Sequence, residues 1–244
     1  MNAVLPDTRA VDRRTETVVD HPEPIEARGA LPIRLAAFGG AVFFVLMLIQ
    51  AGFRNGAPSA TDSDQEIFDF VSSHAGRLQL GAVLLGLAMS AALLWLCGLF
   101  GALRRAEGRT PGLSVAALVG GTLAAASTVM GALIEGTLAT RIDDLGPERV
   151  GMWWTLWLMS MGATLLGLLL LIGMTTVVAL RTSLFPRWFA VTSVLLTLLS
   201  LVGAFTIGYA GTGIQVVAGI AVVLDSVWIF LTSVALWRRP SLAS

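Results

Sequence analysis

The sequence contains no lysine, because all 16 of its basic residues are arginines, and 16 acidic residues balance them. Without lysine, the chain cannot form a Schiff base with retinal or with a substrate carbonyl. A net formal charge of zero gives no electrostatic attraction for nucleic acid. We therefore expect no nucleic-acid partner.

Cysteine and histidine are also scarce. Cys97 is the only cysteine, so an internal disulfide is excluded, and His21 and His74 are too few for a multi-histidine zinc site or a bis-histidine haem bundle. Motifs of zinc proteases, phosphate-binding loops and serine hydrolases are absent. We therefore predict no cofactor and no resident metal, and the sequence argues against an enzyme.

Charged residues make up only 13% of the chain, whereas 55% of it is hydrophobic and its mean hydropathy is +0.79. Crossing the roughly 30 Å hydrocarbon core of a bilayer takes about 20 apolar helical residues. Long runs of this kind recur, and they predict an all-α, polytopic membrane bundle of six transmembrane helices. The predicted spans cover residues 35–53, 78–103, 113–139, 153–180, 188–207 and 214–237.

The fifth span and the first half of the sixth lie in one uncharged run of 37 residues, between Arg187 and Asp225. A single helix of that length would measure about 55 Å, which is too long for the bilayer core. Gly208, Gly211 and Gly213 cluster in its middle, so we place a short turn there and predict two helices.

Arginine is unevenly distributed between the loops. Twelve of the 16 fall in residues 1–34 or in the loops and C-terminal end on the same predicted side, which places both termini in the cytoplasm and the protein in the plasma membrane. Residues 1–30 carry three prolines and many charges, and they predict a disordered cytoplasmic tail before a transmembrane domain at 31–239 and a cytoplasmic end at 240–244. A cleaved signal peptide is the alternative, but the leading region is too long for one.

Small and hydroxyl residues predict where the helices meet, because lipid is as apolar as leucine. They form one stripe on each of three spans, and tryptophans at the span ends predict interfacial anchors. The stripes are Ala117, Gly121, Ala124, Thr128, Gly131 and Glu135; Gln79, Gly86, Ser90, Cys97 and Gly101; and Ser193, Thr197, Ser200 and Ala204. The anchors are Trp153, Trp154 and Trp157 outside, with Trp188 and Trp237 inside.

Asp225 is the strongest functional signal, because it falls near the middle of the last span, where an ionised carboxylate costs about 2.5 to 3.5 kcal/mol. Its helix face continues through Gln215 and Thr232. With no basic residue at that depth, removal from water favours the neutral carboxyl. Two interpretations stay open: a proton- or substrate-binding group, or a carboxyl that bonds a neighbouring helix and fixes packing.

Glu135 is the second candidate, near the outer end of the third span. We expect its carboxylate to reach water or to pair with Arg141 or Arg149.

The outer segment 54–77 contains Ser63-Asp64-Gln65-Glu66, a capping-box pattern followed by apolar residues. It predicts a short surface helix with its aromatic side in the head-group region. Acidic residues and one histidine from this segment and the next outer loop predict an acidic rim, either solvated or able to hold a cation or ligand, although the spacing matches no metal motif. These rim residues are Glu66, Asp69, His74, Asp143 and Asp144.

With the run Ser73-His74-Ala75-Gly76-Arg77 just before the second span, the membrane part resembles uncharacterised six-helix integral membrane proteins that are common in GC-rich bacteria. The resemblance implies the fold and supplies no function.

Three hypotheses about function follow from the residues. The first is a small-molecule or proton-coupled transport component using Asp225, and the second is a non-catalytic partner or sensor subunit that docks membrane proteins or its own copies. The third is an intramembrane enzyme using Asp225 and Glu135. A water-accessible cavity at Asp225 favours the first, a closed bundle the second, and an apolar pocket holding both acids the third.

Overall fold

The computed structural model describes residues 25–108, 112–182, 184–207 and 212–238, and it describes side chains from residue 33 on and, in the last helix, from residue 217 on. The described part folds into six α-helices and one short 3₁₀ helix. These are α1 (Ile25–Phe53), α2 (Asp64–Glu107), α3 (Leu113–Arg141), η1 (Ile142–Asp144), α4 (Pro147–Arg181), α5 (Arg187–Thr206) and α6 (Thr212–Arg238).

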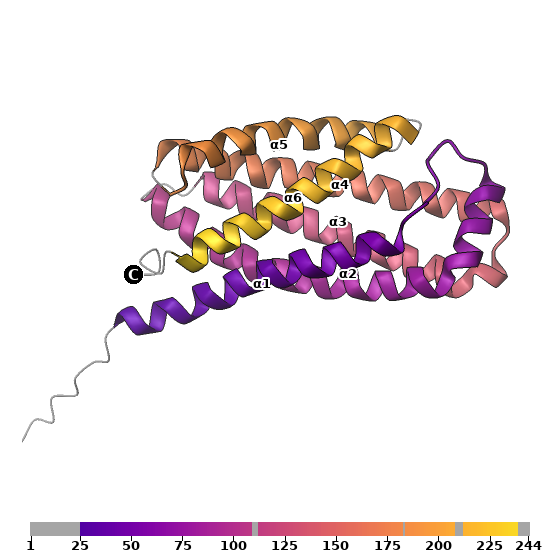
Figure 1. Ribbon diagram of the computed structural model, residues 1–244, viewed down its shortest axis with the longest axis horizontal. Helices are drawn as coiled ribbons and strands as arrows, with labels where there is room; N and C mark the ends of the chain where they lie inside the picture. Colours follow the sequence, from indigo (N-terminus) through magenta and orange to yellow (C-terminus); the bar gives the residue numbers. More distant parts are fainter. Residues whose placement is uncertain (1–24, 109–111, 183, 208–211, 239–244) are drawn as a thin grey trace, which may run out of the picture.

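The helices run alongside one another in an elongated bundle (Figure 1). One end, which we call the loop end, carries the α1–α2 loop and η1, and the opposite end, the terminal end, holds the beginning of α1 and the end of α6. All six helices are long and apolar enough to cross a membrane. The predicted all-helical bundle with six such helices is therefore confirmed.

The break within the last uncharged run is also confirmed, because α5 ends at Thr206 and α6 begins at Thr212. The predicted tail differs at its end: α1 begins at Ile25, so residues 25–30 are helical. Glu26, Ala27 and Arg28 have good helix propensity, which lets the first span continue beyond its apolar part. The rest of the predicted tail, residues 1–24, and the end at 240–244 lie outside the described residues.

The predicted surface helix is part of α2, which runs unbroken for 44 residues. Its capping box is present: the Ser63 N–H donates to Glu66 Oε2 at 2.9 Å, and the Glu66 N–H donates to Ser63 Oγ at 3.3 Å. Figure 1 shows these first turns lying across the loop end before α2 runs along the bundle. The expectation of a separate short helix is therefore wrong.

The aromatic side of these turns packs against the bundle. Val71 is fully buried, and the Phe70 ring meets the edge of Trp154 with 5.9 Å between ring centroids. Trp154 and Trp157 are themselves buried, so their predicted role as interfacial anchors is wrong. The first turns of α2 cover the ends of α3 and α4, and this cover removes both indoles from the bundle surface.

Small residues bring α3 and α4 into backbone contact. All six residues of the stripe predicted on the third span are buried. A Cβ atom added to Gly167 would lie 2.5 Å from the backbone nitrogen of Ala124, and one added to Gly120 would lie 2.7 Å from that of Leu171. Only glycine permits this approach between the two helices.

The stripe predicted on the second span does not face the bundle. Gln79, Ser90 and Cys97 are exposed, and α2 instead buries large side chains such as Trp95 and Leu99. On α5 the stripe is half right, because Ser193 and Ser200 are buried whereas its other two members are half-buried. Small residues tolerate lipid as well as a protein neighbour, so their spacing alone does not identify a contact face.

At the terminal end, α3 is capped by a side chain from α2. The N–H groups of Leu113 and Ser114 each donate to one carboxylate oxygen of Glu107 at 2.8 Å. The N-cap residue, Gly112, supplies no side-chain hydrogen bond of its own. Glu107 therefore satisfies backbone donors that the start of a helix otherwise leaves unpaired.

We expect Glu107→Ala to lower the free energy of unfolding by about 1 kcal/mol, the usual cost of removing a cap. Glu107→Gln keeps one acceptor oxygen and should lose less. Thermal unfolding of the purified protein in detergent, followed by circular dichroism, measures both changes. Identical stability of Glu107→Ala and the wild type would contradict this role.

Candidate functional site

Asp225 lies at the middle of α6, thirteen residues from each end of the helix, and is 1% exposed. One carboxyl oxygen, Oδ2, accepts a hydrogen bond from the hydroxyl of Ser200 on α5 at 3.0 Å. The other, Oδ1, is buried and has no hydrogen-bond partner among the described residues. Half of the carboxyl group therefore joins two helices, and the other half is left unpaired.

A cavity of about 540 Å³ lies inside the bundle, and Asp225 forms part of its wall. It extends from the α1–α2 loop, where Arg54 and Pro58 line it, to residues in the middle of the bundle. Helices α1, α2, α3, α4 and α6 all contribute to its wall, and most contributors are apolar. The polar or charged lining residues besides Asp225 are Gln50, Arg54, Trp95, Thr128, Trp157, Thr164 and Ser226.

Unpaired polar atoms gather at this cavity. Five buried side-chain nitrogen or oxygen atoms lack a partner in the described part of the chain, and three of them belong to lining residues: Asp225 Oδ1, Trp95 Nε1 and Trp157 Nε1. Buried polar groups in folded proteins are nearly always hydrogen-bonded, to protein or to another molecule. One acceptor and two donors without a protein partner thus belong to residues of the cavity wall.

A cluster of polar and charged side chains surrounds Arg54 at the loop-end side of the cavity. Its Nε donates to Glu135 Oε1 at 3.0 Å, its Nη2 donates to Glu135 Oε2, and the guanidinium lies 4.7 Å from the centre of the Trp157 ring. With its amide oxygen turned toward the guanidinium, the buried Gln50 accepts hydrogen bonds from Arg54 at 2.8 to 3.1 Å. The cation is therefore held by a carboxylate, an amide and an aromatic face.

This cluster corrects the expectation for Glu135. The carboxylate is 1% exposed and pairs with Arg54, whereas Arg141 pairs with Asp144 at 2.9 Å. Glu135 also does not belong to the lining of the central cavity. The partner comes from the end of α1, which lies 81 positions earlier in the chain, so sequence proximity favoured the wrong arginines.

Of the other two residues predicted on the Asp225 face, only Thr232 has a described side chain. Thr232 is fully buried, and its hydroxyl donates to the Ile229 carbonyl at 2.8 Å, but it does not line the cavity. The side chain of Gln215 lies outside the described residues.

Four of the five residues of the predicted acidic rim have separate local interactions. Glu66 belongs to the capping box, Asp69 accepts from Gln65 Nε2 at 2.8 Å, and the His74 ring stacks on Phe70. Asp144 forms the ion pair with Arg141 described above, and Asp143 is exposed. Within the described ranges, no three histidine, cysteine, aspartate or glutamate residues are grouped so that they could hold a metal ion.

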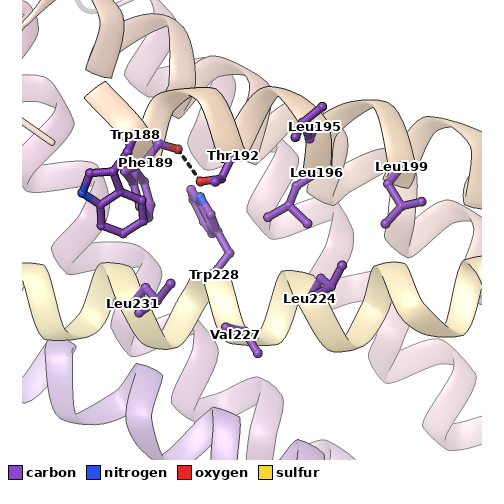
Figure 2. A pocket seen from close by; sticks show the side chains of 10 residues that line it. All are labelled: Trp188, Phe189, Thr192, Leu195, Leu196, Leu199, Leu224, Val227, Trp228 and Leu231. Atoms are coloured by element: carbon purple, nitrogen blue, oxygen red, sulfur yellow. Dashed lines mark hydrogen bonds between the residues drawn. The ribbon is translucent and has the colours of Figure 1, made fainter. Parts of the chain in front are cut away.

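A second hollow of about 330 Å³ lies on the bundle surface between α5 and α6. Figure 2 shows Trp228 of α6 standing between Phe189 and Thr192 on one side and leucines on the other. The Trp228 N–H donates to Ser193 Oγ at 2.8 Å, and the Thr192 hydroxyl donates to the Phe189 carbonyl at 2.9 Å. Because these polar groups are already paired, the hollow offers only apolar contact.

Sequence reasoning found Asp225 but missed most of the cavity wall. Gln50 and Arg54 carried a usable signal, since Gln50 is the only amide in the first apolar run and lies one helical turn before Arg54. Trp157 is predicted at a membrane interface, and nothing in the local sequence of Trp157 or Trp95 distinguishes a cavity wall from an interface or a packed core.

Comparisons of this chain with protein-family models, with curated proteins and with solved structures find no match. The functional argument therefore depends on the geometry of the cavity and on the chemistry of its lining.

Proposed function

We propose that this protein is a proton-coupled carrier that takes a small molecule into the central cavity and holds it against Asp225. The observation that supports it is the unpaired Oδ1 atom of a buried carboxyl group in the wall of a cavity of about 540 Å³. Pockets of about 300 to 1,000 Å³ are typical of small-molecule sites.

The position of Asp225 supports a functional role. A carboxylate at mid-membrane is costly, and such residues usually mark paths of ions, protons or substrates. If the group served packing alone, both of its oxygens would be expected to bond neighbouring helices, yet only Oδ2 does so among the described residues. A carboxyl with one free oxygen can take up and release a proton or a ligand donor.

The two competing hypotheses have less support. An intramembrane enzyme using two acids needs both in one pocket, but Glu135 is paired with Arg54 and lies outside the cavity lining. A purely structural subunit is favoured by a closed bundle, whereas this bundle is hollow. Docking of a partner membrane protein or of a second copy of the chain stays a prediction, because no particular surface of the described residues supports it.

The orientation of the protein in the membrane follows from the arginine distribution. We place the terminal end in the cytoplasm and the loop end outside a plasma membrane, because Arg104, Arg105, Arg181 and Arg187 all lie at the terminal end. In this orientation the cavity reaches from the outer side to the middle of the membrane.

Proton flux in reconstituted vesicles tests the proposal. Under an imposed pH gradient, with the membrane potential clamped and a pH-sensitive dye trapped inside, wild-type vesicles should change internal pH faster than protein-free vesicles. Asp225→Asn should reduce the flux to the protein-free rate, because an amide cannot exchange the proton. Flux that is equal in the variant and the wild type would contradict the proposal.

Asp143→Asn is the matched control, since it makes the same substitution at an exposed acid of the loop end. It should leave the flux unchanged. Equal yields and equal circular dichroism spectra of the three proteins exclude loss of folding as the cause.

A further inference from the structure

The central cavity contains one acidic side chain, Asp225, that is not paired with a cation among the described residues. Among its described lining residues only Arg54 and Asp225 have side chains that are ordinarily charged. Arg54 is neutralised by Glu135, whereas the only partner of Asp225 among the described residues is the Ser200 hydroxyl, which carries no charge. A buried charge is costly unless it is paired, so the group that best complements this wall is a cation with a hydrogen-bond donor.

The remainder of the wall requires that such a cation have an apolar body. Leucine, methionine, alanine and phenylalanine side chains form most of the surface between Arg54 and Asp225, for example Phe43, Met89 and Leu168. A strongly hydrated ion would lose its water here without replacement, because apolar side chains offer it no hydrogen bonds. An apolar chain or ring, by contrast, gains from contact with this surface.

The cavity opens between α1 and α6. The two helices are in contact at Phe44 and Phe230, whose rings stack with 5.0 Å between their centroids, and Figure 1 shows the helices separating toward the loop end. Four lining residues on the separated stretches are exposed, and all four are apolar or glycine: Leu48, Ala51, Gly219 and Val223. In a membrane this opening faces the lipid, so the entering molecule has to be soluble in the bilayer.

From these three observations we propose that the substrate of the cavity is a hydrophobic amine, which enters from the lipid between α1 and α6 and binds with its ammonium group at Asp225. The proposal extends the proposed function and uses the same site. An ammonium N–H donates to Oδ1 while Oδ2 keeps its bond to Ser200, and the apolar body occupies the space toward Arg54. Uptake of the cation and uptake of a proton then compete for one carboxylate, which couples the two.

Equilibrium binding to the purified full chain in lipid nanodiscs tests the substrate class. The probes are 4-phenylbutylamine, 4-phenylbutanol and 4-phenylbutyrate, which share one body and differ in the charge of the head group. Equilibrium dialysis with radiolabelled amine gives the Kd of the amine directly and the Kd of the alcohol by competition. The Kd of the amine should be lower than that of the alcohol by about tenfold or more, the equivalent of one charge-assisted contact of about 1.4 kcal/mol or more. The carboxylate should not displace it.

Asp225→Asn should remove the preference, so that amine and alcohol bind equally, and Asp143→Asn should retain it. Equal binding of all three probes to the wild type, tightest binding of the carboxylate, or amine binding that Asp225→Asn leaves unchanged would each overturn the proposal. If the cavity binds no amine, the protein-containing nanodiscs will retain no more amine than empty nanodiscs, and this result would also overturn the proposal.

A substitution at Gly219 tests the route by which the amine enters the cavity. A Cβ added to Gly219 meets no atom within 4 Å, so Gly219→Phe places a ring at the opening without disturbing the helix contacts. It should slow the association of 4-phenylbutylamine. Ile220→Phe is the control, because Ile220 is 49% exposed and does not line the cavity, and its association rate should stay at the wild-type value. Equal rates in both variants would overturn entry between α1 and α6.

Failure of this inference is distinguishable from failure of the proposed function. Binding without flux would contradict the carrier and keep the amine site. Proton flux that depends on Asp225, together with equal binding of the three probes, would keep the carrier and overturn the amine.

Discussion

Replacing Glu135 by glutamine is expected to destabilise the protein strongly, by about 3 to 5 kcal/mol, because it leaves the Arg54 guanidinium in the bundle without its counter-charge. The Glu135 side chain is 2% exposed and that of Arg54 is 17% exposed, so water can replace little of the lost interaction. Gln50 and the Trp157 ring still contact the cation, but neither carries a negative charge. Unfolding by SDS titration, followed by circular dichroism, measures the change.

A second variant separates the ion pair from a general loss of packing. Replacing both Arg54 and Glu135 by methionine removes both charges together, and buried ion pairs exchanged for apolar side chains often cost little. The double variant should therefore be more stable than Glu135→Gln. Glu148→Gln, at an exposed glutamate of α4, should leave stability unchanged. A double variant that is no more stable than Glu135→Gln would contradict the cost assigned to the unpaired Arg54.

The second large effect is expected at Gly167, where α4 approaches the backbone of α3. A Cβ there would lie 2.5 Å from Ala124 N and 2.7 Å from Gly120 O, and both are backbone atoms that cannot turn aside. Gly167→Ala should therefore cost about 1 to 3 kcal/mol, despite the better helix propensity of alanine. Gly167→Leu should prevent the folded protein from accumulating, as judged by size-exclusion chromatography of the detergent-extracted protein.

Gly173→Ala is the control on the same helix. A Cβ at Gly173 would lie 3.5 Å from Thr197 Cγ2, an ordinary van der Waals distance, so stability should stay equal to the wild type or rise slightly. Equal stability of Gly167→Ala and Gly173→Ala would contradict the close contact of α3 and α4.

Part of the candidate site was predictable from the sequence. Asp225 is identified by its charge in an apolar run, and its burial on α6 together with Thr232 agrees with the predicted face. The cavity was not predictable, because a wall formed by Trp95 and Trp157 has the same local composition as a packed core. Its existence depends on how five helices fit together, and no single helix contains that information.

The sequence alone determined the number of helices and where the last long run divides, because these depend on local hydrophobic length, on glycine and on the bilayer thickness. It also identified a face of α3 that is buried in the bundle. Only the tertiary structure decided which face of α2 is buried, which arginine pairs with Glu135, and what surrounds Asp225. The reason is physical: lipid and protein interior are equally apolar, so hydropathy separates spans from loops but does not separate the inside of a bundle from its lipid-facing surface.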